Sequence, residues 1–382
     1  MNRPTHSSSN IARPAADSAN IVRLIEKEGA NINRIARILR EHKESVRYRY
    51  KQRILANGFK IQAKPNHERL GLKRLVLTGN LESNWWDHYL QLFTLLNETG
   101  YFVGFFRILP DSRLVANVSI PSQFIPDLER LLSALASRHI LHVKRIYSFD
   151  WFRQMPMLAQ YYDFSVDRWD FDWRLSRGEN EGLLNVQPST MGRFQYTDLL
   201  LIKELQLDAA RPLSEIAEKL RLSYKTALRH FHHIVEEGLI HGYLVNWLKT
   251  GFDPKRAVIP VIRHKYLPLF LLVNNITPSE ARHLRLTTER LPYLYSEALG
   301  KDYFAEVILP LDQSIEGLQY LRELLGRFRE RADFGLVDPE YSLGFTVSYQ
   351  LYNWEANKWI FDHRSVIERI EILMGSRRQV TE

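Results

Sequence analysis

Apolar residues recur at helical spacing within residues 214–240. Ala227, Phe231, Ile234 and Val235 lie at i, i+4, i+7 and i+8, which places them on one buried stripe of a helix. Gly238 comes after the stripe, and a glycine there is typical of a helix end. Two shorter helical patterns precede this helix, and an alternating segment that predicts a pair of strands follows it.

The same order of patterns occurs earlier, in residues 33–59. Val46, Tyr50 and Ile54 form the matching stripe, and Gly58 ends that helix. The residues after Gly58 again predict a β-hairpin. Helix, helix, short turn, helix and hairpin is the order of a winged helix-turn-helix, whose third helix enters the major groove of DNA.

A second pattern follows each of these units, in the order strand, helix, strand, strand, helix, strand. In the first copy the segments are 73–81, 84–100, 101–110, 113–121, 124–139 and 140–149. In the second copy they are 267–275, 278–292, 293–301, 302–310, 314–330 and a final strand near 334–343. This order predicts a ferredoxin-like sandwich in each copy.

The chain also repeats itself in sequence. WDFDWR, beginning at Trp169, returns 190 positions later as WIFDHR, beginning at Trp359, and VANVSIP (115–121) matches FAEVILP (304–310). We therefore interpret the chain as a tandem duplication. The aromatic residues of the first tail alternate from Trp169 as they would on a strand, so we expect them to pack against a sheet or a neighbouring domain.

The predicted fold class is α+β, with two winged helix-turn-helix domains alternating with two ferredoxin-like (βαββαβ) sandwich domains. The expected borders are a disordered tail (1–17), the first winged helix-turn-helix (18–66), the first sandwich (70–150), an aromatic tail and linker (151–192), the second winged helix-turn-helix (193–250), the second sandwich (256–350), and a second aromatic tail with a C-terminal helix (351–382).

Composition adds limits to this picture. The 382 residues are 45% hydrophobic and include no cysteine, which excludes disulfides, thiolate metal sites and cysteine nucleophiles. No apolar run is long enough to span a bilayer, and the N-terminus has no apolar signal segment. We expect a cytoplasmic protein with no membrane partner.

The net charge of +8 is concentrated in one region. Residues 31–74 contain 13 Lys or Arg and three Glu, whereas residues 214–256 contain seven Lys or Arg and five acidic residues. A local excess of positive charge is typical of a surface that binds phosphates, although a solvated helix face with no partner has the same composition.

The HFHH sequence at 230–233 lies on the third helix of the second unit. Neighbouring histidines on a helix diverge by about 100°, which argues against a metal site. Donor-rich side chains on the face opposite the buried stripe suit base edges and phosphates of double-stranded DNA. The expected DNA-binding residues are Lys43, Ser45, Arg47, Tyr48, Lys51, Lys60, Lys64, Tyr224, Lys225, Thr226, Arg229, His232 and His233. Arg49 and Arg53 flank the first buried stripe, so we expect them to pair with Glu41 or Glu44 instead of DNA.

The order of units resembles a tandemly duplicated, archaeal-type member of the Lrp/AsnC, or feast/famine, family of transcription regulators. The third-helix segment TALRHFHHIVEEGLI and the segment ALGKDYFAEVILP carry the resemblance. It implies a regulator that self-associates through its sandwich domains and binds a small effector, here at Gly300, Asp302 and Tyr303. Those three residues also suit a simple turn between strands. The first copy has no such G-x-x-D-Y segment.

The main interpretation is a sequence-specific regulator, without enzymatic activity, that reads DNA with two unlike winged helices. A protein that coats DNA without choosing sequences has the same features. A further alternative comes from siroheme decarboxylases, a lineage resembling this family, which use the two-part architecture for tetrapyrrole chemistry with His and Arg around the substrate. Paired carboxylates, a nucleophile elbow, a P-loop and H-E-x-x-H are absent from the sequence. We predict no cofactor, no metal and no catalytic residue.

Overall fold

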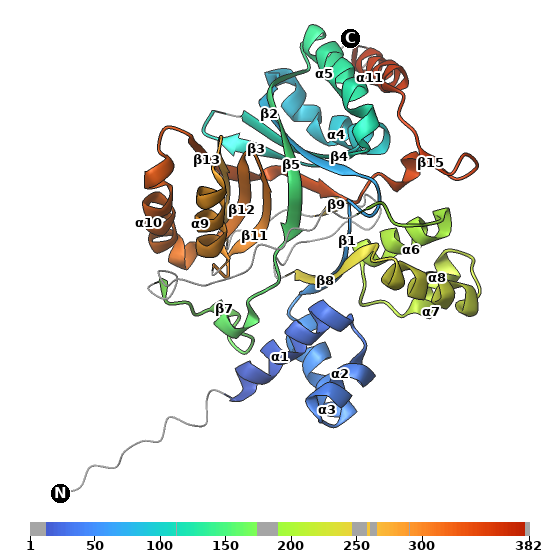
Figure 1. The fold of residues 1–382 in the computed structure, drawn as a ribbon, viewed down its shortest axis with the longest axis vertical. Coiled ribbons are helices and arrows are strands. Elements are labelled where there is room, and N and C mark those ends of the chain that lie inside the picture. The colour runs from blue at the N-terminus through green and yellow to red at the C-terminus, as the bar shows by residue number, and fades with distance from the viewer. Residues whose placement is uncertain are drawn as a thin grey trace, which may run out of the picture.

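The computed structural model describes residues 13–111, 113–173, 190–246, 258–259, 266–289 and 291–378, and Figure 1 shows how their elements are arranged. Helices and strands are mixed throughout, so the α+β class is confirmed. Residues 1–12, most of the expected N-terminal tail, lie outside the described residues, and the first helix begins at Arg13, earlier than the expected border.

The first helix-turn-helix unit consists of α1 (Arg13–Glu28), α2 (Ile32–Leu39) and α3 (Lys43–Arg49), which continues as the π-helical turn η1 (Tyr50–Leu55). Side chains cap its helices. Asn31 accepts a hydrogen bond from the backbone N–H of Arg34, and His42 accepts one from Glu44. Such caps satisfy backbone groups that a helix end leaves unpaired. The expected stripe of Val46, Tyr50 and Ile54 is buried.

The second unit repeats this arrangement with α6 (Tyr196–Leu207), α7 (Leu213–Lys219) and α8 (Tyr224–Glu236). Ser223 caps α8 by accepting a hydrogen bond from the backbone N–H of Thr226. Ala227 and Ile234 are fully buried, and Gly238 takes a positive φ of 60° just after the helix. The helix end is therefore confirmed, and the stripe is confirmed in part. Phe231 is only partly buried, and Val235 is 54% exposed, because eight steps of about 100° turn it about 80° away from Ala227.

The expected hairpin within the first copy is wrong. Strand β1 (Lys60–Pro65) pairs with β8 (Ile240–Asn246) of the second copy, so the two units share one antiparallel ribbon (Figure 1). Ile61 lies opposite Val245, and all but Lys60 and Lys64 of β1 are buried. An exposed strand edge has unpaired backbone N–H and C=O groups, and pairing with β8 satisfies those of β1. The strand pair expected after α8 is also wrong as far as the described residues reach, because residues 240–246 form the single strand β8.

Each sandwich has the βαββαβ order. The first contains β2 (Lys73–Leu81), α4 (Tyr89–Gly100), β3 (Phe102–Leu109), β4 (Arg113–Ile120), α5 (Ile125–Ser137) and β5 (Leu141–Gln154). The second contains β10 (Tyr266–Val273), α9 (Pro278–Thr288), β11 (Leu294–Gly300), β12 (Tyr303–Pro310), α10 (Ser314–Leu325) and β13 (Ala332–Phe345). Short 3-10 turns precede α4, α5 and α10.

The two sandwiches merge into one closed barrel. Their strands follow the order β10-β12-β11-β5-β2-β4-β3-β13, and β13 also pairs with β10. The seams between the halves are β5 with β11 and β3 with β13, and the short β9 (Val258–Ile259) adds to β13 at the edge. Closure leaves the eight barrel strands with a partner on both sides, which removes the exposed edges of the separate sheets.

The barrel separates two apolar cores. Its interior is filled by aromatic and branched side chains from both halves, including Phe149, Phe270 and Phe304. Helices cover the outside: α4 and α5 lie over the first half, and α9 and α10 lie over the second (Figure 1). The second core, between helices and strands, continues into the helix-turn-helix units.

The aromatic tails cross between the halves. The first tail contains β6 (Tyr162–Asp163) and β7 (Arg168–Trp169), and the second contains β14 (Tyr352–Asn353), β15 (Lys358–Trp359) and then helix α11 (His363–Arg378). Trp169 stacks edge-on against Tyr293 of the second half, with ring centroids 5.3 Å apart. Trp359 donates its indole N–H to the Leu70 carbonyl of the first half at 2.9 Å. Each tail therefore closes the core of the opposite copy.

Among the described helices, none combines the length and the apolar character needed to cross a membrane.

Candidate functional site: a cationic cleft between the barrel and the helix-turn-helix units

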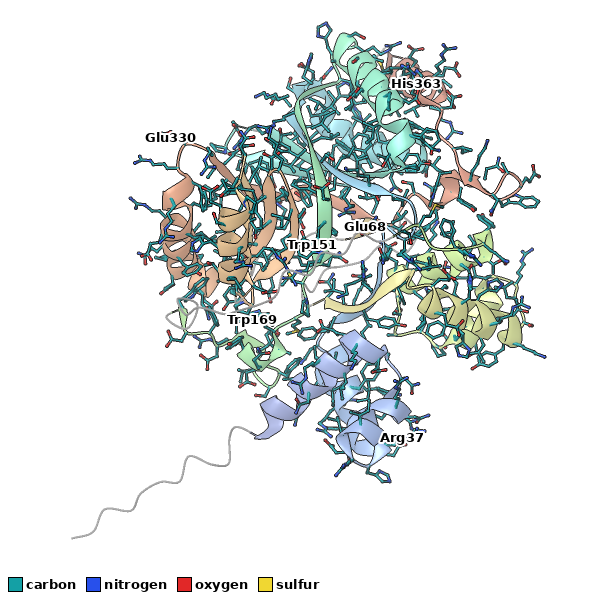
Figure 2. All side chains as sticks on the ribbon, viewed as in Figure 1. Arg37, Glu68, Trp151, Trp169, Glu330 and His363 are labelled. Atoms are coloured by element: carbon teal, nitrogen blue, oxygen red, sulfur yellow. The ribbon has the colours of Figure 1, made fainter. Side chains whose placement is uncertain are left out.

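A cleft of about 980 Å³ lies where the barrel meets the shared ribbon of the helix-turn-helix units. Figure 2 shows two of its residues, Glu68 and Trp151, near the middle of the molecule. The segment from the end of β1 to the start of β2 forms one wall, the end of β5 forms another, and α9 of the second half contributes two residues. The lining is Lys64, Pro65, Asn66, His67, Glu68, Gly71, Leu72, Lys73, Arg74, Ser122, Phe149, Asp150, Trp151, Phe152, Arg153, Gln154, Pro156, Met191, His241, Arg285 and Glu289.

Positive charge exceeds negative charge in this lining, with five Lys or Arg against three acidic residues. Three of the cations lie within 4 Å of a carboxylate, and Arg285 has the longest of these separations. Lys73 lies 3.6 Å from Asp150, and Arg153 lies 2.6 Å from Glu289. Among the described residues, Lys64 has no carboxylate within ion-pair distance. The cleft therefore keeps cations available for an anionic ligand.

Two cations of the cleft, Lys64 and Arg74, are removed from water by the protein atoms around them. Burial lowers the pKa of Lys64, which the nearby Glu26 partly opposes, and burial lowers the pKa of Arg74 to about 10. Burial also lowers the pKa of His67 and His241, so both imidazoles are neutral near pH 7. A bound anion would relieve this unfavourable environment, because an opposite charge stabilises a desolvated cation.

Arg285 has the most unusual environment in the cleft. Only 9% of its side chain is exposed, and its Nε and Nη1 atoms have no hydrogen-bond partner among the described residues. The nearest carboxylate oxygen, on Glu297, is 3.8 Å from Nε. Its guanidinium carbon lies 4.3 Å from the ring centroid of Trp151. Leaving such a charged donor unsatisfied costs about 1–3 kcal/mol or more, which is typical of a functional site.

A smaller chamber of about 140 Å³ extends from the cleft into the barrel and shares His67, Arg74 and Phe152 with it. The Arg74 guanidinium carbon lies 3.9 Å from the Phe152 ring centroid. Deeper in the chamber, the carboxylate of Glu306 accepts hydrogen bonds from Ser296 Oγ at 2.6 Å and Asn117 Nδ2 at 3.2 Å. Burial raises the pKa of Glu306. The chamber thus places the cation Arg74 and the buried carboxyl group of Glu306 along one wall-to-interior path.

The expected DNA-binding residues of α3 and η1 mostly face solvent. Lys43, Ser45, Tyr48 and Lys51 are exposed. Arg47 is partly exposed and pairs with Glu44 at 2.7 Å, which occupies its guanidinium.

Arg49 pairs with Glu41, as expected. Lys60 and Lys64 are not on a wing of their own. They lie on the shared ribbon, because β1 pairs with β8, and Lys64 lines the cleft. Part of the basic region at 31–74 therefore faces the cleft and not the outer surface of α3.

The expected DNA-binding residues of α8 differ in their exposure to solvent. Tyr224, Lys225, Arg229 and His232 are exposed, and Thr226 is partly buried beside its cap.

The buried carboxylate of Asp198 binds two of the HFHH imidazoles: His230 Nδ1 is 2.7 Å from Oδ1, and His233 Nδ1 is 3.1 Å from Oδ2. Asp198 also accepts a hydrogen bond from the Gln195 backbone N–H at 2.7 Å. His233 thus serves the packing of α8 on α6 through a buried acid, which the spacing of HFHH alone could not indicate.

The three expected effector residues lie at a seam of the barrel. A side chain at Gly300 would meet the Ser148 carbonyl at 2.9 Å, because β5 and β11 approach closely there. Asp302 accepts a hydrogen bond from the Asn275 backbone N–H at 2.9 Å, and the Tyr303 hydroxyl donates to Glu297 at 3.1 Å. The contacts with Asn275 and Glu297 lie within the second half, whereas the close approach at Gly300 and the ion pair of Asp302 with Arg145 at 3.4 Å join the two halves.

The cleft residues His67, Arg74, Trp151, Arg153, His241 and Arg285 were not predicted from the sequence. The one available signal was the basic excess, which extends to Arg74. Arg285 and Trp151 are 134 positions apart and belong to different copies. Only the pairing of β5 with β11 brings them together.

Comparison with known proteins relates the chain to one solved fold over most of its length. Comparisons with protein-family models and with curated protein sequences find no match. The structure of the siroheme decarboxylase NirDL is similar over 93% of this chain and 99% of that chain, with a TM-score of 0.51 and 12% identity. NirDL in co-complex with an iron-uroporphyrin III analogue matches equally, at 11% identity.

An AsnC family transcriptional regulator from Agrobacterium tumefaciens covers 37% of this chain, with a TM-score of 0.28 and 14% identity. The similarity to NirDL extends over both halves of the chain and shows a shared fold.

Proposed function

We propose that this protein binds a tetrapyrrole with several carboxylate side chains in the cationic cleft and removes carboxyl groups from it as CO2. The observation that carries the proposal is Arg285, a buried cation in the cleft with two nitrogens that lack hydrogen-bond partners. A ligand carboxylate beside the guanidinium would offset its desolvation. The full-length fold shared with the siroheme decarboxylase NirDL agrees with this choice of substrate.

The cleft suits such a ligand in size and surface. Its volume of about 980 Å³ is at the upper end of small-molecule sites, as a macrocycle requires. Lys64, Arg74 and Arg285 line the cleft with positive charge, and the rings of Phe152 and Trp151 support the guanidinium groups of Arg74 and Arg285. Any iron in the macrocycle belongs to the substrate.

Decarboxylation needs a carboxylate held in place and a proton delivered to the carbon that loses it. The bond between that carbon and the carboxylate breaks, CO2 leaves, and the electron pair left on carbon takes up a proton. In our proposal Arg74 holds one substrate carboxylate at the mouth of the chamber. Glu306, whose pKa is raised by burial, supplies the proton from within.

The binding step is tested by absorbance titration of the purified protein with iron-uroporphyrin III. Arg285→Gln should weaken binding at least tenfold, because it removes the buried cation. Arg282→Gln is the matched control, since Arg282 lies on the same helix but is exposed. Equal affinity of the two variants, or no shift of the Soret band with the parent protein, would overturn the proposal.

The chemical step is tested by mass spectrometry of siroheme incubated with the protein. The parent should yield product lighter by CO2. Glu306→Gln should keep the affinity for the macrocycle within about threefold but lose turnover, because an amide cannot supply the proton. Turnover at the parental rate in this variant would exclude Glu306 as the proton donor.

DNA binding is a second candidate function, favoured by the exposed donors on the outer face of α3 and η1. The shared ribbon would hold both reading helices in one chain, so the two half-sites would differ. This surface and the cleft use different residues, which allows each function to be removed separately. Selection from random DNA, followed by binding at moderate salt, tests it.

A further inference from the structure

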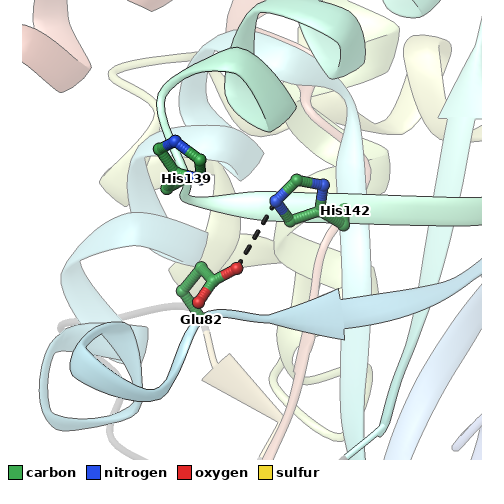
Figure 3. A group of neighbouring side chains, drawn as sticks. All are labelled: Glu82, His139 and His142. Atoms are coloured by element: carbon green, nitrogen blue, oxygen red, sulfur yellow. Dashed lines mark ion pairs between the residues drawn. The ribbon is translucent and has the colours of Figure 1, made fainter.

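A cluster of two imidazoles and a carboxylate lies at the end of the first sandwich. Glu82 directly follows β2, His139 lies in the turn between α5 and β5, and His142 is the second residue of β5 (Figure 3). One donor atom from each side chain lies within 4.8 Å of the other two. His142 Nε2 is 3.4 Å from Glu82 Oε1.

The backbone fixes all three positions. The Glu82 N–H donates to the Ile140 carbonyl at 3.1 Å, which holds the end of β2 against the turn. His139 takes a positive φ of 52°, a conformation that non-glycine residues adopt rarely and that directs its side chain back toward Glu82. The backbone therefore brings Glu82 and His139 close together at this end of the sheet.

We propose that Glu82, His139 and His142 form a binding site for a divalent transition-metal ion. Imidazole nitrogens with one carboxylate favour Zn²⁺, Ni²⁺ or Cu²⁺ over Mg²⁺ and Ca²⁺, which prefer oxygen ligands. In tetrahedral coordination at about 2.0–2.1 Å, donor atoms lie about 3.3 Å apart, so small side-chain rotations would close the cluster. Three protein ligands leave at least one position for water.

The duplication supplies an internal comparison. Leu81 pairs with Leu141 in the first half, and Val273 pairs with Ala332 in the second. This register places Asn274, Glu330 and Asp333 where the first half has Glu82, His139 and His142. Asp333 is bound to Arg113 at 2.6 Å. The second half thus lacks both imidazoles, and the site belongs to the first half alone.

The site is separate from the cationic cleft. Arg74 and Glu82 lie eight residues apart along and just beyond β2, which corresponds to about 26 Å at roughly 3.3 Å per residue. Glu82 and His142 have 43% and 46% of their side chains exposed, so an ion can reach them from solvent. The metal would link the start of β5 to the end of β2 and would lie outside the cleft.

The experiment is calorimetric titration of the untagged full-length protein with zinc chloride. The parent should bind one saturable equivalent that the double variant His139→Ala/His142→Ala loses, and Glu82→Gln should bind at least tenfold more weakly. His232→Ala is the control, because it removes one exposed histidine from α8. It should bind as the parent does.

A thermal melt provides the second measurement. Zinc should raise the midpoint of the parent and leave that of the double variant unchanged, since an ion that binds only the folded state stabilises it. All three side chains are at least partly exposed, so the variants should fold. Equal zinc affinity of parent and double variant, or binding by the parent that does not saturate, would overturn the proposal.

Discussion

The Arg285 guanidinium lies over the Trp151 ring, 4.3 Å from its centroid, and joins α9 of the second half to β5 of the first. Arg153 lies over the same ring at 5.0 Å. The two arginines differ in their partners. Arg153 donates to the buried carboxylate of Glu297 at 2.8 Å, whereas Arg285 only approaches it. One cation therefore balances the buried acid, and the other is available to a ligand.

This difference predicts that substituting Arg153 lowers the free energy of unfolding much more than substituting Arg285. Arg153→Met should lower the free energy of unfolding by about 3–5 kcal/mol, because it leaves Glu297 buried without its bound cation. Arg285→Met should change it by no more than about 1 kcal/mol, since the lost cation has two unsatisfied nitrogens and methionine still packs on Trp151. Urea denaturation of both variants measures the effect. Equal destabilisation would mean that Arg285 is a structural partner of Glu297.

Glu26 predicts a pH dependence of stability. Its carboxylate accepts a hydrogen bond from the Met157 backbone N–H at 2.8 Å, yet burial raises its pKa to about 7 from 4.5. The folded state therefore binds more protons than the unfolded state between these values. Stability should fall as pH rises from about 4.5 to 7, by up to about 3 kcal/mol.

The comparison with Glu26→Gln isolates this contribution. Glutamine keeps an acceptor oxygen for the Met157 N–H but does not ionise. The variant should match the parent near pH 4.5 and exceed its stability at pH 8, measured by urea denaturation at each pH. A difference between the two proteins that does not change with pH would show that Glu26 ionises normally.

The crossed tails predict that each copy depends on the other for its core. Trp169→Ala and Trp359→Ala should each lower the free energy of unfolding by about 3–5 kcal/mol, because both indoles are almost fully buried. Trp354→Ala is the control, since Trp354 is 64% exposed. Thermal melting of the three variants provides the comparison. An unchanged midpoint for Trp169→Ala would exclude the packing role.

The sequence predicted those parts of the fold that depend on local pattern. The buried residues Ala227 and Ile234 of α8 and the glycine after the helix follow from spacing and residue type. Pairing between the copies was not predictable in this way. The sequence after Gly58 predicts a strand, but contains nothing that distinguishes a neighbouring hairpin strand from β8, which lies 180 residues further on.

The same limit applies to the cleft. A buried lysine or arginine is recognised by its surroundings, and the surroundings of Arg285 come from β5 of the other copy. The HFHH segment shows the same limit within one copy. Helical spacing led us to expect no metal there, and it gave no sign that the buried Asp198, 32 residues upstream of His230, binds two of the imidazoles.

The outer face of α3 predicts how DNA binding would depend on salt. Lys43 and Lys51 are exposed, and each phosphate contact contributes about 0.9 to the slope of log affinity against log salt. Lys43→Ala/Lys51→Ala should therefore flatten the slope by about two units, whereas Lys225→Ala/Arg229→Ala on α8 should do so only if the second unit also contacts phosphates. Fluorescence anisotropy across a salt series measures both. Arg285→Gln should leave both slopes unchanged, because Arg285 is buried in the cleft. A slope that Lys43→Ala/Lys51→Ala does not alter would place any DNA contact away from α3, and a slope that Arg285→Gln alters would mean that the nucleic acid occupies the cleft.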